Sequence, residues 1–203
     1  PVQMPADKSD VGEEGDEGEE SADWLVTVNK ASALWTKNKS EISKEEYQGF
    51  YKSAAGAWDE PWETMHFNVE GHLEHTGLLF IPSSKPFNLF EPDRKNSIKL
   101  YVKRVFITDD CQELVPPYLR FLRGVIDSQD LPLNLSRELL QASPILDLIR
   151  KDVTKRTLNA LTNKAKKKPE DYATFWETFG PVMKEGLYED MDNKDKLLEI
   201  ARF

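Results

Sequence analysis

Up to about Asn134 the spacing of apolar residues is strand-like in several runs and helix-like in others, and beyond Asn134 it is helix-like. Short apolar runs between polar and turn-forming residues predict strands over residues 24–28, 64–69, 73–81, 98–107 and 124–126. In residues 98–107 the alternation is loose, which is typical of a central strand packed on both faces. The pattern therefore predicts a mixed α/β fold, followed by a helical coil.

Capping residues and periodic apolar faces predict the helices. Ser43 and Glu46 have the spacing of a capping box, and Ser143 is an N-cap followed by a proline. Gly180–Pro181 is expected to end the helix that Pro169 begins. A short helix is expected over residues 118–122 and a last one from about Asn193. The apolar faces predicted for the four longer helices are Tyr47, Phe50, Tyr51 and Ala54; Ile145, Leu148, Ile149 and Val153; Tyr172, Phe175, Trp176 and Phe179; and Leu197, Leu198 and Ala201.

Almost all of the chain's net charge of −9 lies in its first residues. Residues 1–23 hold nine acidic residues and one lysine, a net charge of −8, with few apolar side chains. Such a segment cannot offset the entropy lost on ordering, so residues 1–22 are expected to be disordered. Either they form a linker to an upstream domain, which Pro1 in place of an initiator Met favours, or they form a solubilising tail.

Several classes of site and location are disfavoured by the composition. No apolar run approaches the roughly 18 residues that span a membrane, and no signal peptide is recognisable. The single Cys111 excludes an internal disulfide, suits a reducing compartment such as the cytoplasm, and is expected to be unreactive beside acidic residues. His72 and His75 would face opposite sides of one strand, so no metal site is expected with His66. The basic run Lys164–Lys168 is better explained as a solvated helix C-terminus than as a nucleic-acid patch.

The segment 127–141 combines a polar loop with the start of a short helix. Ser136 is a suitable N-cap, which places Arg137 in the first helical turn, where a cation is unfavourable. A guanidinium beside the amide groups of a helix N-terminus is well placed to bind a phosphate. Residue spacing alone leaves open an ordinary surface arginine, or an ion pair with Asp127 or Asp130.

A second candidate site is the proline-interrupted loop of residues 82–96. Regular structure cannot bury its large side chains Phe87, Leu89 and Phe90. They either form an exposed apolar patch that binds a partner, or they fold back onto the sheet.

Residues 130–141 (DLPLNLSRELLQ) resemble the signature of the middle domain of the heat shock protein 90 family. The similarity continues in order from about Asp23 to Phe203. Residues 29–35 and 176–180 are most similar to the bacterial branch of the family, high-temperature protein G. Other matching stretches are residues 33–36, 45–52, 69–71, 79–82, 99–107 and 122–128.

The resemblance implies roles for two sets of residues. In that family the arginine matching Arg137 reaches the γ-phosphate of ATP bound in the N-terminal domain, and Gln141 is expected to assist it. Leu131 and Leu133 match an apolar patch that docks on the N-terminal domain, and core packing is the alternative. The second set matches residues implicated in client contact, and consists of Trp58, Phe87, Leu89 and Phe90.

The resemblance also implies the organisation of the chain. It predicts an acidic linker (residues 1–22), a large α/β subdomain with a mixed sheet like that of ribosomal protein S5 domain 2 (residues 23–155), and a helical coil (residues 156–203) that stops before a small α/β subdomain. ATP with Mg²⁺ would be bound mainly by the N-terminal domain, and homodimers would form through the C-terminal domain. Both domains are missing from the sequence, so the chain is expected to be monomeric and to turn over no ATP alone.

Two functional hypotheses follow. In the first, the chain is a catalytic-support module of an ATP-dependent chaperone, and it contacts both ATP and unfolded or partly folded clients. In the second, it is a non-catalytic module that binds clients or co-chaperones. No nucleic-acid or membrane partner is expected in either case.

Overall fold

A computed structural model gives the fold and describes residues 3–5, 25–27, 33–91, 97–134, 140 and 142–201. The chain divides into two units, Pro1–Ala33 and Leu34–Phe203. In the first unit, β1 (Gln3–Pro5) pairs antiparallel with β2 (Leu25–Thr27), which confirms the strand expected over residues 24–28. β1 lies within the segment that composition assigned to a disordered linker. The difference is local, because Gln3–Pro5 precede the acidic residues.

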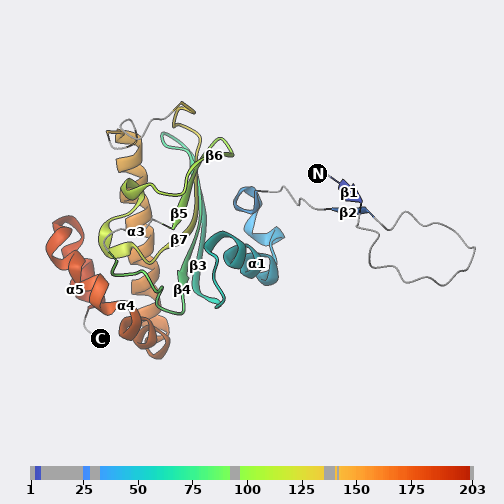
Figure 1. The fold of residues 1–203 in the computed structure, drawn as a ribbon. Coiled ribbons are helices and arrows are strands. Elements are labelled where there is room, and N and C mark those ends of the chain that lie inside the picture. Colours follow the sequence, from blue (N-terminus) through green and yellow to red (C-terminus); the bar gives the residue numbers. More distant parts are fainter. Residues whose placement is uncertain are drawn as a thin grey trace, which may run out of the picture. The chain divides into compact units, whose positions relative to one another are not determined.

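The second unit is built on a five-stranded mixed sheet of order β3-β4-β7-β5-β6 (Figure 1). The central strand β7 is antiparallel to β4 and parallel to β5, and the remaining pairs are antiparallel. This arrangement confirms the predicted fold class. The strands are β3 (Pro61–Val69), β4 (His75–Pro82), β5 (Ile98–Val102), β6 (Val105–Thr108) and β7 (Arg123–Ser128).

Residues 98–107 form a hairpin, so the prediction of one central strand there is wrong. The chain turns at Lys103 and Arg104, whose φ angles are 50° and 67°, and Val102 pairs with Val105. Two-residue turns with positive φ usually contain Asn or Gly, which explains why no turn was expected. β5 is therefore internal, and β6 is an edge strand.

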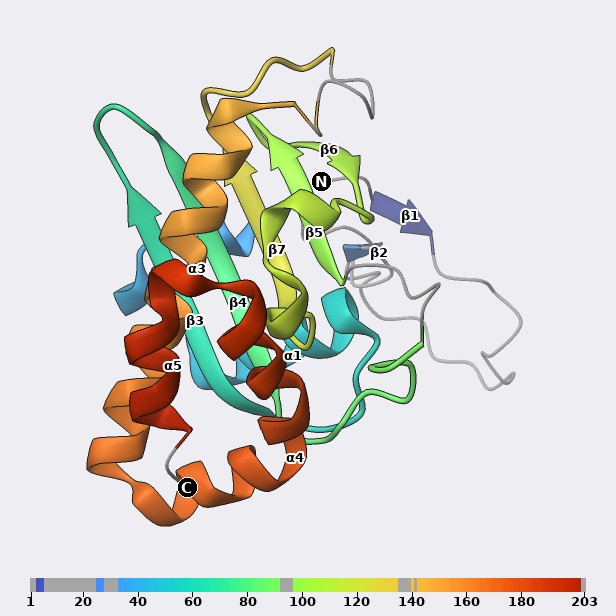
Figure 2. The same cartoon turned by 90° about the vertical axis from the view of Figure 1, so that its left-hand side faces the viewer.

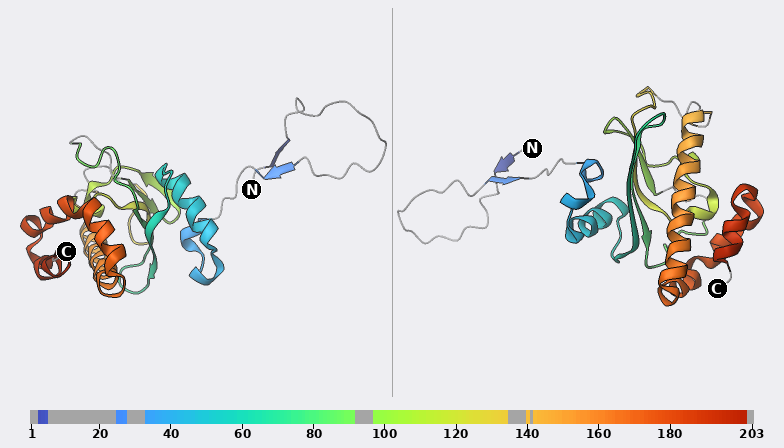
Figure 3. Two further views of the ribbon diagram at one scale, coloured as in Figure 1. Left: turned by 90° about the horizontal axis from the view of Figure 1, so that it is seen from below. Right: turned by 180° about the vertical axis from the view of Figure 1, so that it is seen from behind.

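Helices lie on both faces of this sheet. α1 (Lys44–Ala55) covers one face and α3 (Pro144–Lys167) the other, and the views in Figures 1 and 3 agree on this. α4 (Pro169–Glu189) and α5 (Lys194–Ile200) pack with α3 (Figure 2). The short 3₁₀ helices are η2 (Leu34–Thr36), η3 (Lys39–Glu41), η4 (Gln112–Leu114), η5 (Pro117–Leu119) and η6 (Met191–Asn193).

The predicted helix starts are confirmed at atomic detail. The Ser43 hydroxyl accepts a hydrogen bond from the Glu46 N–H (3.1 Å), and the Ser43 N–H donates to the Glu46 carboxylate (2.9 Å). The Ser143 hydroxyl accepts from the Leu146 N–H (3.4 Å). The short helix expected over residues 118–122 is the 3₁₀ turn η5.

Two expectations about the later helices are wrong. α4 does not end at Gly180–Pro181 but continues to Glu189. Pro181 is exposed, while Phe179 and Val182 are buried on either side of it, so packing holds the helix together against the cost of an internal proline. The second correction is that Leu148 and Leu198 are exposed, because the buried faces of α3 and α5 are centred on other residues, including Leu146 and Ile200.

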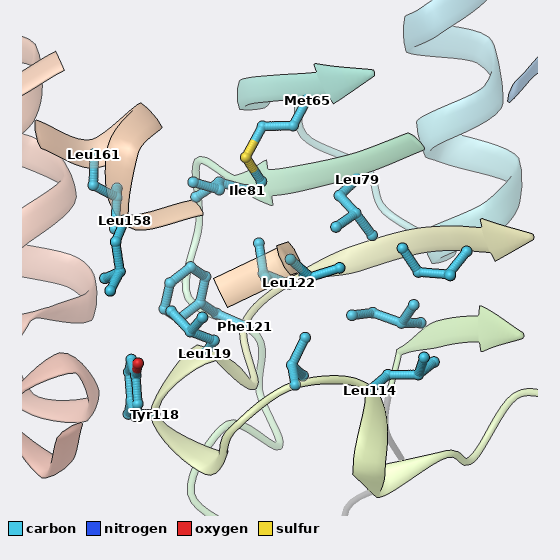
Figure 4. Packing of buried hydrophobic residues seen from close by; sticks show 14 of the residues in the cluster. Met65, Leu79, Ile81, Leu114, Tyr118, Leu119, Phe121, Leu122, Leu158 and Leu161 are labelled. Atoms are coloured by element: carbon cyan, nitrogen blue, oxygen red, sulfur yellow. The ribbon is translucent and has the colours of Figure 1, made fainter. Parts of the chain in front are cut away.

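One hydrophobic core joins the sheet to the helices. Figure 4 shows Leu79 and Ile81 of β4 close to Phe121 and Leu122, which precede β7, and the core continues into α3, α4 and α5. The expected boundary at residue 155 falls inside α3, which is one continuous helix. In the structure the helical part therefore packs as a continuation of the α/β part.

Candidate functional site

Two buried polar residues end the central strand β7. Asp127 and Ser128 are fully buried and belong to the strand, although the sequence suggested that a polar loop begins at Asp127. One carboxylate oxygen of Asp127 accepts a hydrogen bond from the Trp35 indole N–H (2.8 Å), and the other accepts from the Arg104 backbone N–H (3.2 Å). A buried carboxylate requires such donors, because burial without them is costly. Asp127 thereby fixes η2 and the β5–β6 turn to the end of β7.

Trp35 connects this strand end to α1 and β3. Its ring lies 4.7 Å from that of Tyr101 and 5.9 Å from that of Phe50, measured between centroids. Its carbonyl oxygen is 2.9 Å from Nε2 of His66. Burial and, secondarily, the charge of Asp127 raise the pKa of Tyr101. Trp35 is thus a structural centre for the site.

The β5–β6 turn brings two cations to the same strand end. The Lys103 N–H donates to the Ser128 carbonyl (3.0 Å), in addition to the bond from the Arg104 N–H to Asp127. Both side chains are exposed. The left-handed conformation of the two residues costs energy, and these hydrogen bonds help to offset it.

The loop after β7 is held by a second set of hydrogen bonds. The Ser128 hydroxyl accepts from the backbone N–H groups of Asp130 and Leu131 (both 3.3 Å). The Asp130 carboxylate accepts from the Glu74 N–H (2.6 Å), so both carboxylates considered as partners for Arg137 bind groups of the folded unit. Hereafter, "β7-end site" denotes Trp35, Arg104, Asp127, Ser128 and Asp130 with the described residues 131–134 that follow.

The two leucines predicted to dock on another domain differ in exposure. Leu131 is 1% exposed and belongs to the core, whereas Leu133 is 52% exposed. Core packing therefore accounts for Leu131, and Leu133 is available for contact with a partner.

Arg137 and Gln141, together with Ser136, lie outside the described residues. Their neighbour Leu140 is buried in the same core as Leu131. Leu131 and Leu140 thus belong to one core on either side of the segment that contains Arg137.

The second candidate site contains the two most exposed aromatic side chains among the described residues, Trp58 and Phe87. Trp58 is 97% exposed, Phe87 is fully exposed and Phe90 is half-exposed. Leu89 is only 2% exposed, so of the two alternatives for this loop Leu89 follows the second and packs into the core. Its burial fixes the loop to the core and leaves its neighbours in solvent.

One carboxylate brings Trp58 and this loop together. Asp59 accepts hydrogen bonds from the Ser83 N–H (3.1 Å) and the Ser84 N–H (2.9 Å) through one oxygen, and from the Tyr51 hydroxyl (2.8 Å) through the other. Burial opposes ionisation of Asp59, but these donors outweigh it and lower its pKa. Hereafter, "aromatic patch" denotes Trp58, Phe87 and Phe90.

Arg120 supports the far side of the aromatic patch. Its Nε donates to the Leu89 carbonyl (2.9 Å), and its guanidinium forms a two-point ion pair with Glu185 of α4. The Phe90 ring lies 5.5 Å from both the Arg120 guanidinium and the Lys85 ammonium. Cations over an aromatic ring stabilise a half-exposed phenylalanine.

The two candidate sites lie at opposite ends of the sheet. Ser128, at the end of β7, pairs with His75 at the start of β4. Arg123, at the start of β7, pairs with Phe80 near the end of β4, and Pro82 pairs with Pro61, which follows Trp58 and Asp59. A partner at one end therefore leaves the other end accessible.

The remaining polar candidates have structural roles. Among the described residues no cluster of His, Cys, Asp and Glu has the arrangement of a metal site. His75 Nε2 is 3.1 Å from Asp152, and His66 Nδ1 is 2.7 Å from the Tyr47 hydroxyl. Burial, assisted by Glu113, raises the pKa of the Cys111 thiol to about 12.

Lys164 departs from the expected solvated helix end. It forms ion pairs with Glu63 (2.9 Å) and Asp171 (3.0 Å) and lies 4.5 Å from the Trp62 ring. Burial lowers its pKa, but the two carboxylates outweigh burial and raise it. None of the helices in the described part of the chain is long and apolar enough to cross a membrane.

Comparison with known proteins decides the family. The family model described as Hsp90 protein matches residues 4–203. The chain belongs to the Hsp90 family. This confirms the resemblance identified from residues 130–141.

Individual relatives and a solved structure show which members of the Hsp90 family, and which of their domains, this chain is similar to. A protein named Chaperone protein HtpG from Paramagnetospirillum magneticum is 60% identical over 177 residues, which are 87% of the chain and 28% of that protein. Its namesake from Rickettsia rickettsii is 56% identical over 178 residues, 88% of the chain and 29% of that protein. The structure of the middle domain of a Plasmodium falciparum heat shock protein matches with a TM-score of 0.70 and 32% identity, covering 81% of the chain and 62% of that domain's chain. The Hsp90 chain thus has the middle-domain fold, and it spans less than a third of the length of the named HtpG relatives.

Sequence reasoning missed the residues that shape both sites. Trp35, Asp59 and Arg104 were given no role, although each makes hydrogen bonds that fix a candidate site. A tryptophan directly before the polar stretch of residues 36–41 was the available signal for Trp35. The partners of Asp59 and Arg104 are distant in sequence, so no local pattern marks them.

Proposed function

We propose that the chain is the middle segment of an ATP-driven chaperone, in which Arg137 contacts the γ-phosphate of ATP bound by an N-terminal domain. ATP with Mg²⁺ is held mainly by that domain, and Gln141 assists Arg137. The chain alone is a monomer that turns over no ATP. The complete protein is cytoplasmic and dimerises through a C-terminal domain.

The observation that carries this proposal is the anchored loop at the β7-end site. Leu131 and Leu140 are both buried, and the hydroxyl of Ser128 and the carboxylate of Asp130 fix the start of the loop. Fixed points before and after the segment that contains Arg137 suit the proposed reach into another domain, because they reduce the freedom that the chain must lose on binding. Cations of the β5–β6 turn lie at the same strand end and favour an anionic ligand.

A direct test replaces the matching segment of the P. magneticum chaperone with this chain. We expect the chimera to hydrolyse ATP, and Arg137→Ala to lower turnover by about 10²-fold or more while nucleotide affinity changes by less than about threefold. Arg137→Lys keeps the charge but not the forked donor geometry, so we expect it to restore little of the rate. Lys155→Ala, which removes an exposed cation of α3, is the control.

The outcome separates the two functional hypotheses. Unchanged turnover in the Arg137→Ala chimera, or no turnover in the unsubstituted chimera, would favour the non-catalytic interaction module. Leu133→Ala provides a second comparison, because Leu133 is exposed and its loss should reduce turnover without reducing stability. Leu131→Ala should instead destabilise the fold by about 2–5 kcal/mol, as expected for a buried leucine.

The aromatic patch supports a second proposed activity, the binding of unfolded or partly folded clients. Its exposed rings, close to Lys85 and Arg120, suit a surface that holds apolar segments. In the chimera, Trp58→Ala with Phe87→Ala should weaken suppression of the aggregation of a heat-denatured protein. Tyr188→Ala removes an exposed aromatic group from α4 and is the matched control. Equal effects of the two changes would contradict a specific role for the patch.

A further inference from the structure

No strand among the described residues pairs with the outer edge of β3, where the Trp62 carbonyl accepts from Lys164 Nζ (3.4 Å). β3 is the first strand of the sheet and, within the described part of the chain, pairs with β4 alone. Alternate residues of an edge strand direct their backbone N–H and C=O groups away from the sheet. Met65, His66 and Phe67 are nevertheless buried, because η3 and α1 pack on one side of the strand and α3 packs on the other.

Those flanking elements make this edge the floor of a groove of about 810 Å³. One wall is formed by η3 and α1 and includes Tyr47 and Gln48. The other wall is the middle of α3 and includes Asn159 and Asn163. Figure 2 shows β3 as the outermost strand, next to α3. Hereafter this feature is called the β3-edge groove.

The floor and walls combine apolar and amide groups. Pro61, Met65 and Phe67 of β3 present apolar surface, and Ala160 of α3 lies opposite. The side-chain amides of Gln48, Asn159 and Asn163 can donate to carbonyl groups and accept from N–H groups. A narrow groove with these properties fits an extended peptide backbone with small apolar side chains.

Exposed lysines give the β3-edge groove a positive rim. Lys39 and Lys44 are exposed on the α1 side. A smaller adjoining pocket of about 310 Å³ shares Ala160 and Asn163 with the groove and adds exposed Lys167 and Lys168. Among the described residues that line the two pockets, Glu60 and Glu63 are the acidic ones, and Glu63 is paired with Lys164. The rim therefore favours a negatively charged occupant.

We propose that the β3-edge groove binds an acidic peptide in an extended conformation, which adds a sixth strand to the five-stranded sheet. Its apolar residues would face the floor, and its acidic residues would lie beside the lysines. Because Pro61–Phe67 extend over roughly 20 Å, the occupant has about six or seven residues in contact. The site uses neither Arg137 nor the aromatic patch, so it goes beyond the functions proposed above.

The test uses the whole chain and a fluorescent ten-residue peptide in which valine alternates with glutamate. We expect saturable binding by fluorescence anisotropy and protection of β3 amide groups from hydrogen exchange. Lys39→Glu with Lys44→Glu should weaken binding by about tenfold or more at low salt, because rim charges control such association. Lys151→Glu with Lys155→Glu makes the same charge change at exposed positions of α3 that do not line the groove, and should alter affinity by less than about twofold.

Two further probes distinguish the mode of binding. The same peptide methylated on alternate backbone nitrogens cannot complete a strand ladder, so its affinity should fall strongly although its charge is unchanged. A thymidine oligonucleotide of equal charge should not displace the peptide. Absence of peptide binding, equal effects of the two lysine pairs, equal affinity of the methylated peptide, or displacement by the oligonucleotide would each overturn the proposal.

Discussion

Asp127 is a buried carboxylate whose side-chain donor, Trp35, is 92 residues away in the sequence. Its second donor is a backbone N–H in a turn of left-handed residues. Burying the Asp127 carboxylate removes it from water, which costs free energy. The hydrogen bonds from these two donors offset that cost. Asp127 thus fixes η2 and the β5–β6 turn to the end of β7.

Removing one donor should therefore be costly. Trp35→Phe keeps an aromatic ring but leaves the Asp127 oxygen without its 2.8 Å hydrogen bond. We expect the free energy of unfolding in urea to fall by about 1–3 kcal/mol. Trp58→Phe, at an exposed position, should change it by less than about 0.5 kcal/mol. Similar losses for both variants would contradict the role given to Trp35.

The two buried histidines predict the direction of the pH dependence. Burial is the main cause that lowers the pKa values of His66 and His75, although Asp152 partly opposes it for His75. The unfolded chain then binds more protons than the folded one below a pH of about 6.5, so stability rises with pH in that range. We expect the free energy of unfolding to fall between about pH 7.5 and 5.5. His66→Gln with His75→Gln should reduce this slope, and an equal reduction by exposed His72→Gln would contradict the assignment.

At the scale of elements, α4 shows how packing overrides a local stop signal. The helix passes through Gly180–Pro181 because its apolar face is buried before and after them. Gly186, further along, lies against the Tyr118 ring, where an added Cβ would come within 2.8 Å of a ring carbon. Helix propensity and packing therefore act in opposite directions along one helix.

Two substitutions in α4 should have opposite effects. Pro181→Ala restores a backbone donor at an exposed position and should stabilise the fold by about 1–3 kcal/mol. Gly186→Ala raises helix propensity but forces Tyr118 to move, so we expect a net loss of stability despite a propensity gain of about 1 kcal/mol. Thermal unfolding followed by circular dichroism measures both. Stabilisation by Gly186→Ala would show that the contact with Tyr118 yields easily.

At the scale of the whole chain, the second unit has one core. α3 crosses the expected subdomain boundary at residue 155 without a break, and Phe175 and Ile200 belong to the same cluster as the sheet residues. Lys164 adds polar connections between β3 and α4 through Glu63 and Asp171. The α/β and helical parts therefore depend on one another.

This continuity predicts cooperative unfolding of residues 34–203. Tryptophan fluorescence and far-ultraviolet circular dichroism should report one coincident transition in urea. Two separated transitions would indicate that residues 156–203 form an independent unit. Leu158→Ala, a core change in α3, should shift both probes together, and a shift in one alone would contradict the prediction.

Local patterns were sufficient to predict many elements but not their partners. The capping box at Ser43, the N-cap at Ser143 and the strand over residues 73–81 involve neighbours in the sequence, and all three are present. The turn at Lys103–Arg104 was missed because its residues lack the usual turn chemistry. The burial of Leu89 could not be decided from the sequence, because it depends on contacts that a local pattern does not reveal.

The sequence by itself determined the family and the fold class. The signature at residues 130–141 and the capping residues consist of neighbours in the sequence, so they can be recognised without the structure. Tertiary structure alone decided that Leu131 is buried and Leu133 exposed, that Asp59 joins Trp58 to the Phe87 segment, and that β3 has an open, lysine-rimmed edge. These properties arise from burial and hydrogen bonds between residues far apart in the chain. The spacing of apolar residues predicts which face of a helix or strand a residue occupies, but it does not predict which element packs against that face.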